Sequence, residues 1–213
     1  MTWIYRALGK IFIMLSLAVG IIACATFHDL KVRYQLPDAS SALEGTRMAL
    51  RFQDARSSPE ILGAGAVPEF KNFTGDIAFR IDDAAGAELG RGQYRVMEMV
   101  RKAFTMRIEA EGISVAAPGE TEGLQLVVVV KELLLDLMEG RWIAKMDFQA
   151  RLGKSGTLLA TQKISGEAER HQIVGRREAH RAVSEIFTDV VNRLDLQELI
   201  EHAETAHPGL LGR

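Results

Sequence analysis

Cys24 is the single cysteine among the 213 residues, and the chemistry open to a lone thiol is narrowly limited. It can form no disulfide within the chain, and its number excludes a metal site built from several cysteines. Before it stand Ile21, Ile22 and Ala23, two branched apolar residues and then a small one. A small residue before a cleaved bond fits a narrow peptidase site, and the cysteine sulfur is the one nucleophile in this stretch that can carry a thioether-linked diacylglycerol.

The sequence that precedes this thiol has the organisation of an export signal. Arg6 and Lys10 stand near the N-terminus without an acidic residue, and residues 11–22 read IFIMLSLAVGII, which are an n-region and an h-region. As a helix the apolar run spans roughly 18 Å, short of the roughly 30 Å hydrocarbon core of a bilayer. With Ile21-Ile22-Ala23-Cys24, this organisation resembles a bacterial lipobox.

The lipobox resemblance implies a lipoprotein signal peptide over residues 1–23. Cleavage between Ala23 and Cys24 then leaves a lipidated Cys24 as the first mature residue, and attachment by two or three acyl chains is effectively permanent. If the host is Gram-negative, Ala25 stands where an aspartate would resemble an inner-membrane retention signal. We therefore expect a lipid-anchored protein of the cell envelope, on the outer membrane and facing the periplasm.

A signal anchor is the second interpretation of the same segment. Extended to Phe27, the apolar run approaches the lower length limit of a membrane-spanning helix, and Cys24 would then be a buried apolar side chain. Under either interpretation Arg6 and Lys10 hold the N-terminus on the cytoplasmic side, so the remainder of the chain is exported.

The bulk composition is that of an ordinary globular domain, with 47% hydrophobic and 25% charged residues. The formal net charge is -2, which gives no sign of the basic face that sequence-independent phosphate binding requires. We therefore expect no nucleic-acid partner.

Residue patterns divide the exported part into three segments. Residues 24–45 contain the lipidated cysteine and a mostly polar tether, although alternation at Val32, Tyr34 and Leu36 leaves a short strand open. Residues 46–200 carry the apolar periodicities of a single α+β domain in the periplasm. Residues 201–213 form a polar C-terminal tail, which could begin with a turn or two of helix.

Within that domain the spacing of apolar residues predicts strands and two main amphipathic helices. The helices are expected over about residues 93–110 and 175–194, where apolar side chains recur on one stripe. Strands are expected over about 47–53, 76–82, 113–115, 124–137, 142–152 and 157–166, with a loop over 57–75. This order predicts an α+β fold with a mostly antiparallel sheet and the two helices packed on one face.

Several motifs that could carry chemistry also have a structural explanation. Gly153-Lys154-Ser155-Gly156 contains the GKS of a phosphate-binding loop, but it lacks the required glycine five residues earlier and suits a hairpin turn between two strands. The basic cluster of Arg176, Arg177, His180 and Arg181 is more typical of a solvated helix face than of a phosphate site. The five histidines are scattered, so we expect no metal site. The chain contains neither a G-x-S-x-G nor an H-E-x-x-H motif, and we expect no catalytic residues and no cofactor.

The exported part resembles the YajG-type family of bacterial lipoproteins. The resemblance rests on the lipobox, on a strand ending in Asp54-Ala55-Arg56 before Ile61-Leu62-Gly63, on a helix running into residues 110–115, and on the closing amphipathic helix. It implies a poorly characterised envelope lipoprotein without catalytic residues. A charge pair of Asp54 and Arg56 would then hold a strand end.

A weaker resemblance supplies the alternative function. Residues 33–37, RYQLP, look like the tyrosine-containing start of auxiliary lipoproteins of ABC-type lipid transport systems. An activator of a peptidoglycan synthase is a third lipoprotein role with a similar shape. We expect a non-enzymatic lipoprotein whose periplasmic domain binds an envelope protein partner or ligand, and the alternative is a transport component that contacts phospholipid.

Overall fold

The structure is a computed structural model, and it describes residues 29–117, 120, 123–173, 175–206 and 208. The predicted signal peptide over residues 1–23, its cleavage site and the lipid attachment at Cys24 lie outside the described residues. In the part of the chain that is described, no helix is both long and apolar enough to cross a membrane.

The larger of two sheets has five strands, in the order β5-β2-β6-β7-β8. Their bounds are β2 Arg47–Asp54, β5 Ser114–Val115, β6 Leu124–Met138, β7 Arg141–Lys154 and β8 Thr157–His171. β2 pairs in parallel with both β5 and β6, whereas β6, β7 and β8 form an antiparallel meander. β6, which contains four consecutive valines at residues 127–130, therefore lies inside the sheet with a neighbouring strand on each edge.

The smaller sheet has three strands, in the order β1-β3-β4. They are β1 Leu30–Gln35, β3 Ile77–Asp82 and β4 Glu88–Tyr94. β1 runs parallel to β3, and β3 and β4 form an antiparallel hairpin. The side chains of β1 alternate strictly between buried and exposed, so one of its faces belongs to the core.

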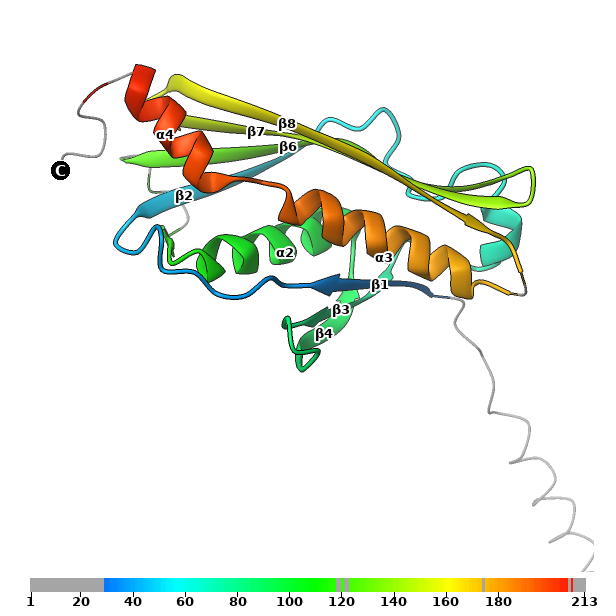
Figure 1. Ribbon diagram of the computed structural model, residues 1–213. Coiled ribbons are helices and arrows are strands. Elements are labelled where there is room, and N and C mark those ends of the chain that lie inside the picture. The colour runs from blue at the N-terminus through cyan, green and yellow to red at the C-terminus, as the bar shows by residue number, and fades with distance from the viewer. Residues whose placement is uncertain (1–28, 118–119, 121–122, 174, 207, 209–213) are drawn as a thin grey trace, which may run out of the picture.

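The two long helices, α2 and α3, lie between the two sheets in Figure 1. α2 spans Val96–Ala110, α3 spans Arg177–Asn192, α4 spans Leu196–Ala206, and the 3-10 helix η1 spans Val67–Phe70. The apolar stripe predicted for the last long helix is buried as a whole: Ala179, Val183, Ile186, Phe187, Val190, Val191 and Leu194. Both long helices cover one face of the five-stranded sheet, as expected.

Alternate side chains of β7 supply the centre of the core. Trp142, Phe148 and the other even-numbered side chains from 142 to 152 are buried on the face toward the helices. Phe148 contacts Phe104 of α2 edge-on at 4.9 Å between ring centroids. Trp142 is fully buried and contacts Phe70 of η1, so it packs inside the fold.

The prediction of one mostly antiparallel sheet is wrong, because there are two sheets and both are mixed. The parallel pairings arise from segments distant in sequence: β1 joins β3, and β2 inserts between β5 and β6. Period-2 alternation shows that a segment is a strand with one buried face, but it carries no information about which strand it pairs with or in which direction.

Two expected boundaries also change. The tether predicted over residues 24–45 is part of the fold from Leu30 onward, since β1 is paired and Leu36 and Leu43 are buried. In the polar tail predicted over residues 201–213, residues 201–206 complete helix α4, in line with the turn or two of helix that the sequence left open, and Ala203 is buried.

The predicted loop over residues 57–75 is fastened to the large sheet by two close approaches. Leu62 bridges Leu135, and the backbone N–H groups of Gly65 and Ala66 donate to Asp136 Oδ1 at 2.8 and 3.1 Å. A Cβ added at Gly65 would lie 1.9 Å from the carbonyl oxygen of Leu137. Glycine is therefore required there for the loop to reach the strand.

Candidate functional site

A groove lined by cationic side chains lies where the small sheet meets the first turns of α3. Its volume is about 970 Å³, and we call it the basic groove. Its seven cationic residues are Lys31, Arg33, Arg80, Arg91, Arg176, Arg177 and Arg181. Its remaining lining is neutral, with Val32, Ala78, Phe79, Gly92, Gln93, His180 and Ser184. An excess of positive charge with no carboxylate in the lining favours an anionic ligand.

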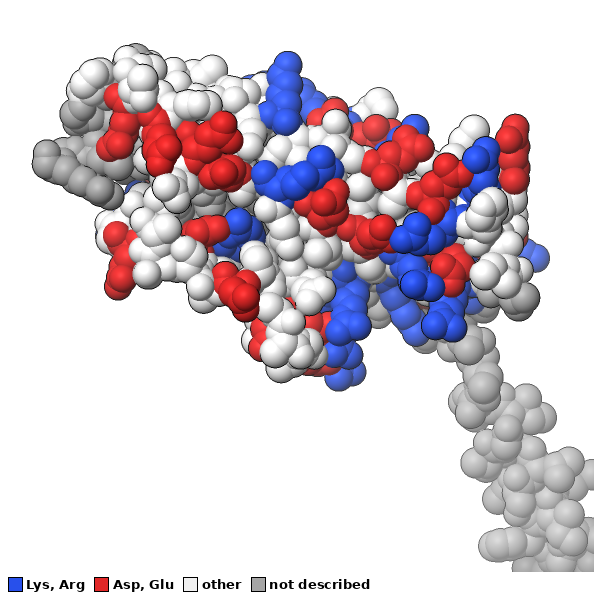
Figure 2. All heavy atoms as spheres, in the orientation of Figure 1, with Lys and Arg blue, Asp and Glu red and all other residues white. Residues whose placement is uncertain are grey.

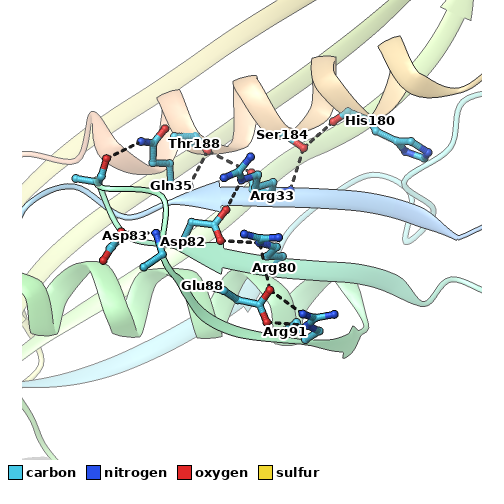
Figure 3. A network of polar contacts seen from close by, with 12 residues as sticks. Arg33, Gln35, Arg80, Asp82, Asp83, Glu88, Arg91, His180, Ser184 and Thr188 are labelled. Atoms are coloured by element: carbon cyan, nitrogen blue, oxygen red, sulfur yellow. Dashed lines mark hydrogen bonds and ion pairs between the residues drawn. The ribbon is translucent and has the colours of Figure 1, made fainter.

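A polar stripe on α3 positions β1 as one wall of the groove (Figure 3). The N–H groups of Lys31, Arg33 and Gln35 donate to His180 Nδ1, Ser184 Oγ and Thr188 Oγ1, at 3.2, 2.9 and 3.2 Å. Four helical residues rise about 6.0 Å and two strand residues about 6.6 Å, so the two spacings match. The outer edge of β1 is therefore paired with a helix, which also prevents it from pairing with another strand.

Asp82 at the end of β3 organises the arginines on the strand wall. Its side chain is fully buried and accepts from Arg33 Nε and, at 2.6 Å, from Arg80 Nε. Glu88 of β4 binds Arg91 at 2.7 Å and lies 3.4 Å from Arg80. Burial raises the pKa of the Asp82 carboxyl, but the hydrogen bonds from Arg80 and Arg33 outweigh it and hold the pKa below its ordinary value.

Three cations of the groove lack a carboxylate partner. Among the described residues, the side chains of Lys31 on the strand wall and of Arg176 and Arg177 on the helix wall form no ion pair. Arg176 lies over the ring of Phe70 at 5.4 Å and donates to the carbonyl oxygen of Glu69 at 3.2 Å. These contacts fix the direction of the guanidinium and leave its charge uncompensated.

His180 is a neutral side chain between these cations. Burial first, and then the charges of Lys31 and Arg176, lower its pKa from 6.5 to about 4. The imidazole packs edge-on against Phe70 at 5.8 Å. Its Nδ1 accepts the N–H of Lys31, so that nitrogen carries no proton.

The polar side chains that could serve as nucleophile or base are engaged in structural hydrogen bonds. Ser184 Oγ accepts from Arg33 N–H and donates to the carbonyl oxygen of His180 at 2.6 Å. His180 uses Nδ1 for the strand, and Asp82 is occupied by two arginines. In the described part of the chain, no group of three or more His, Cys, Asp or Glu side chains could hold a metal ion. The arrangement suits electrostatic binding of an anion.

Several motifs singled out in the sequence lie away from the groove. Ser155 and Gly156, with φ of 52° and 83°, form the turn between β7 and β8, which confirms the hairpin interpretation. Arg56 Nε and Nη2 donate to Asp54 at 2.9 and 2.8 Å, so this pair holds the end of β2 as expected. Asp83, the neighbour of Asp82 in the sequence, is also absent from the groove lining and caps a turn by accepting the N–H of Ala87 at 2.8 Å.

The basic cluster at the start of α3 is the part of the groove that the sequence made visible. Arg176, Arg177, His180 and Arg181 all line the groove, although a solvated helix face was the more typical interpretation. The strand wall was missed, because its four cations come from β1, β3 and β4. The signal that could have found it is the alternation of Lys31 and Arg33 with Val32 and Tyr34.

Comparisons with known proteins give a fold and no family. No family model matches the chain, and no curated protein matches it. Among solved structures, protein XCC0632 from Xanthomonas campestris, of the DUF330 family, is similar with a TM-score of 0.55 at 16% identity, covering 82% of this chain and 97% of that one. A minor lipoprotein from Acinetobacter baumannii has a TM-score of 0.37 at 9% identity, with 75% and 92% covered. Lipoprotein GNA1162 from Neisseria meningitidis has a TM-score of 0.26 at 12% identity, with 69% and 99% covered.

The similarity to the Xanthomonas protein shows a shared fold. The YajG-type resemblance stays a prediction.

Proposed function

We propose that this protein is a non-enzymatic lipoprotein of the cell envelope whose domain binds an anionic ligand in the basic groove. The observation that carries the proposal is the lining of that groove, which holds seven cationic side chains and no carboxylate. The pattern around Cys24 supplies the envelope address. In this proposal the acylated cysteine holds the domain at a membrane, with the outer membrane as the expected one, and the groove selects what it binds there.

The geometry supports binding better than catalysis. Arg33 and Arg80 are fixed by the buried carboxylate of Asp82, and β1 is fixed by the polar stripe of α3. Guanidinium groups held in this way are pre-organised for carboxylate or phosphate oxygens, to which arginine can donate two parallel hydrogen bonds. Little side-chain entropy is then lost when the ligand binds.

The anchor is tested by intact mass. The mature chain purified from membranes should begin at Cys24 and carry diacylglycerol and an amide-linked acyl chain. A Cys24→Ser protein should lose the acyl groups and the cleavage. Continued acylation of the Cys24→Ser protein would contradict the anchor.

The groove is tested by photocrosslinking in cells. A photoreactive amino acid replaces Arg181, which lines the groove with an exposed side chain, and everything bound is identified, protein and lipid. Leu158 is the matched control position, because it is 59% exposed and lies at the far end of β8. Specific adducts from position 181 alone are expected. The same adducts from both positions would contradict a ligand in the groove.

The same crosslinking experiment distinguishes a protein-binding lipoprotein from the alternative, a component of a lipid transport system. An auxiliary lipoprotein of an ABC-type lipid transport system should crosslink to phospholipid and copurify with a permease or a substrate-binding subunit. The observation that favours this alternative is the mixed lining, in which Ala78 and the parts of β1 and β3 around Val32 and Phe79 lie beside the cations, since a phospholipid presents both a charged headgroup and apolar chains. A protein adduct without lipid supports an interaction module instead.

A further inference from the structure

We infer that the domain docks on the membrane that carries its anchor, with the basic groove turned toward phosphate headgroups of an anionic bilayer. This inference rests on the proposed function and names the ligand class of the same groove. Four independent features of the described residues support it, namely the position of β1, the uncompensated cations, the exposed apolar tips and the engagement of nearby carboxylates.

The start of β1 cannot lie far from an acylated Cys24. Asp29 follows Cys24 by five positions, and five residue steps span at most about 18 Å even when the chain is fully extended. The end of the molecule at which β1 begins therefore faces the bilayer closely. In Figure 1 the start of α3, the turn between β6 and β7, and η1 lie at this same end, which we call the anchor end.

The cations of the groove are concentrated at the anchor end. Lys31 is the second residue of β1, and Arg176, Arg177 and Arg181 stand in or beside the first turn of α3. Figure 2 shows Lys and Arg side chains gathered there, beside the start of β1. Basic residues at the surface of an anionic membrane each increase binding by about five-fold, and the attraction falls off within a Debye length.

Exposed apolar side chains flank these cations. Val67 of η1 is 54% exposed, Met138 at the end of β6 is 54% exposed, and Ile173 after β8 is 76% exposed. Their segments are joined: Gly65 N–H donates to Asp136 on β6, and Gln172 N–H donates to the carbonyl oxygen of Gly140 at 2.8 Å. Apolar tips beside basic residues are the combination that binds at a membrane interface.

The carboxylates of the anchor end do not cancel this charge. Glu139 and Glu169 both bind Arg141, at 3.4 and 2.5 Å, and Glu178 lies 3.4 Å from Arg181. Arg141 with its two glutamates therefore carries one net negative charge, and the pair of Glu178 with Arg181 is nearly neutral. The three cations that have no carboxylate partner among the described residues, Lys31, Arg176 and Arg177, outweigh that single negative charge.

Site-specific fluorescence on the acylated full chain tests this orientation. Acylation consumes the thiol of Cys24, so an Ile173→Cys protein carries one free thiol for an environment-sensitive dye. Vesicles are made of phosphatidylcholine alone or of phosphatidylcholine with phosphatidylglycerol, each with a nitroxide-bearing lipid as quencher. Quenching at position 173 is expected with phosphatidylglycerol and should weaken as salt is added.

Leu158→Cys is the matched label control. It lies on β8, the strand that Ile173 follows, and is 59% exposed, but the thirteen residue steps from Leu158 to His171 place it roughly 43 Å from the anchor end. No quenching is expected there. Equal quenching at positions 158 and 173, or quenching at 173 that is independent of phosphatidylglycerol, would overturn the inference.

Charge-reversal variants test whether docking depends on the cations of the groove or on the net charge of the whole domain. Lys31→Glu with Arg177→Glu should lower the ratio of docked to undocked protein by about 25-fold or more. Both side chains are exposed, and an acidic residue in the first turn of α3 is compatible with the helix dipole. Lys102→Glu with Lys163→Glu changes the net charge equally on exposed positions elsewhere and should leave docking unchanged.

The outcomes distinguish this inference from the proposed function. An acylated chain that does not dock contradicts the inference alone. Absence of acyl groups in the intact mass contradicts the anchor on which both rest. Groove crosslinks to an acidic protein, with no effect of phosphatidylglycerol at position 173, assign the groove to a protein partner and overturn docking.

Discussion

At the residue scale, Asp82 holds two guanidinium groups in place at the strand wall of the groove. A buried carboxylate is stable only when its charge is compensated, and Arg33 and Arg80 do so here. Asp82→Asn removes the charge and keeps the shape, so the two arginines lose their common acceptor. We expect unfolding free energy to fall by about 2 kcal/mol, below the usual figure for a buried pair because both arginines are partly exposed.

Urea denaturation measures the loss of unfolding free energy in Asp82→Asn. Binding of inorganic phosphate to the same variant is the second measurement, and it should not fall. Asp82→Asn releases the two arginines, which costs some pre-organisation, but it also removes the negative charge that they share. We expect the second effect to be the larger, so affinity for inorganic phosphate in the folded variant should be retained or increased. Asp83→Asn, in the adjacent turn, is the control for the change of residue type. Loss of phosphate binding together with unchanged stability would contradict this role for Asp82.

His180 should make stability depend on mild acid. Folding lowers the pKa from 6.5 to about 4, so between these values the unfolded chain binds more protons than the folded protein, and stability falls as pH falls from about 6.5 toward 4. Because the imidazole is partly exposed, we expect a loss of roughly 2 kcal/mol or less.

A His180→Asn variant is the control for this pH dependence. The side-chain oxygen of the asparagine can still accept the N–H of Lys31, and asparagine does not titrate. Urea denaturation at pH 7 and pH 4.5 should show a smaller difference for this variant than for the native chain. An identical pH dependence in both proteins would remove His180 from the explanation.

At the element scale, the polar side chains along α3 allow β1 to be an edge strand, because they accept the N–H groups on its outer edge. Ser184→Ala removes the acceptor for Arg33 N–H while preserving helix propensity. We expect a loss of about 1 to 2 kcal/mol, since a strand N–H is left without a partner, and faster hydrogen exchange at Arg33. Thr105→Ala on α2, a half-buried polar residue away from β1, should show neither effect on β1.

The elements differ in how far the sequence could predict them. α3 and the meander of β6, β7 and β8 follow from periodicity, because their apolar faces are wide and continuous. β4 reads ELGRGQY, with no buried side chain, so its hydrogen bonds to β3 alone make it a strand and no pattern could reveal it. Likewise, residues 24–45 are mostly polar because β1 exposes Lys31, Arg33 and Gln35 on one face.

At the scale of the whole molecule, the groove depends on contacts that join distant parts of the chain. Lys31 and His180 meet across 149 positions, and Arg33 meets Asp82 across 49. The basic cluster at residues 176–181 is visible in one short stretch of sequence. Its position beside β1, β3 and β4, however, depends on the parallel pairing of β1 with β3. The sequence therefore indicates the helix wall of the groove but not its strand wall, and the excess of positive charge becomes evident only when the fold brings the two walls together.

The short link between anchor and domain gives a prediction for the entire molecule. If docking at the anchor end is favoured because the domain is held close to the bilayer, a flexible linker inserted after Thr26 should weaken it. About twenty Gly/Ser residues lengthen the roughly five-residue link about five-fold, and effective concentration falls with roughly the −3/2 power of length, so the docked fraction relative to undocked should drop about ten-fold. The dye at position 173 reports this as reduced quenching. The same Gly/Ser segment appended after Arg213 is the control and should change nothing. Quenching that is insensitive to the inserted linker would mean that the surface of the domain binds the bilayer without help from the anchor.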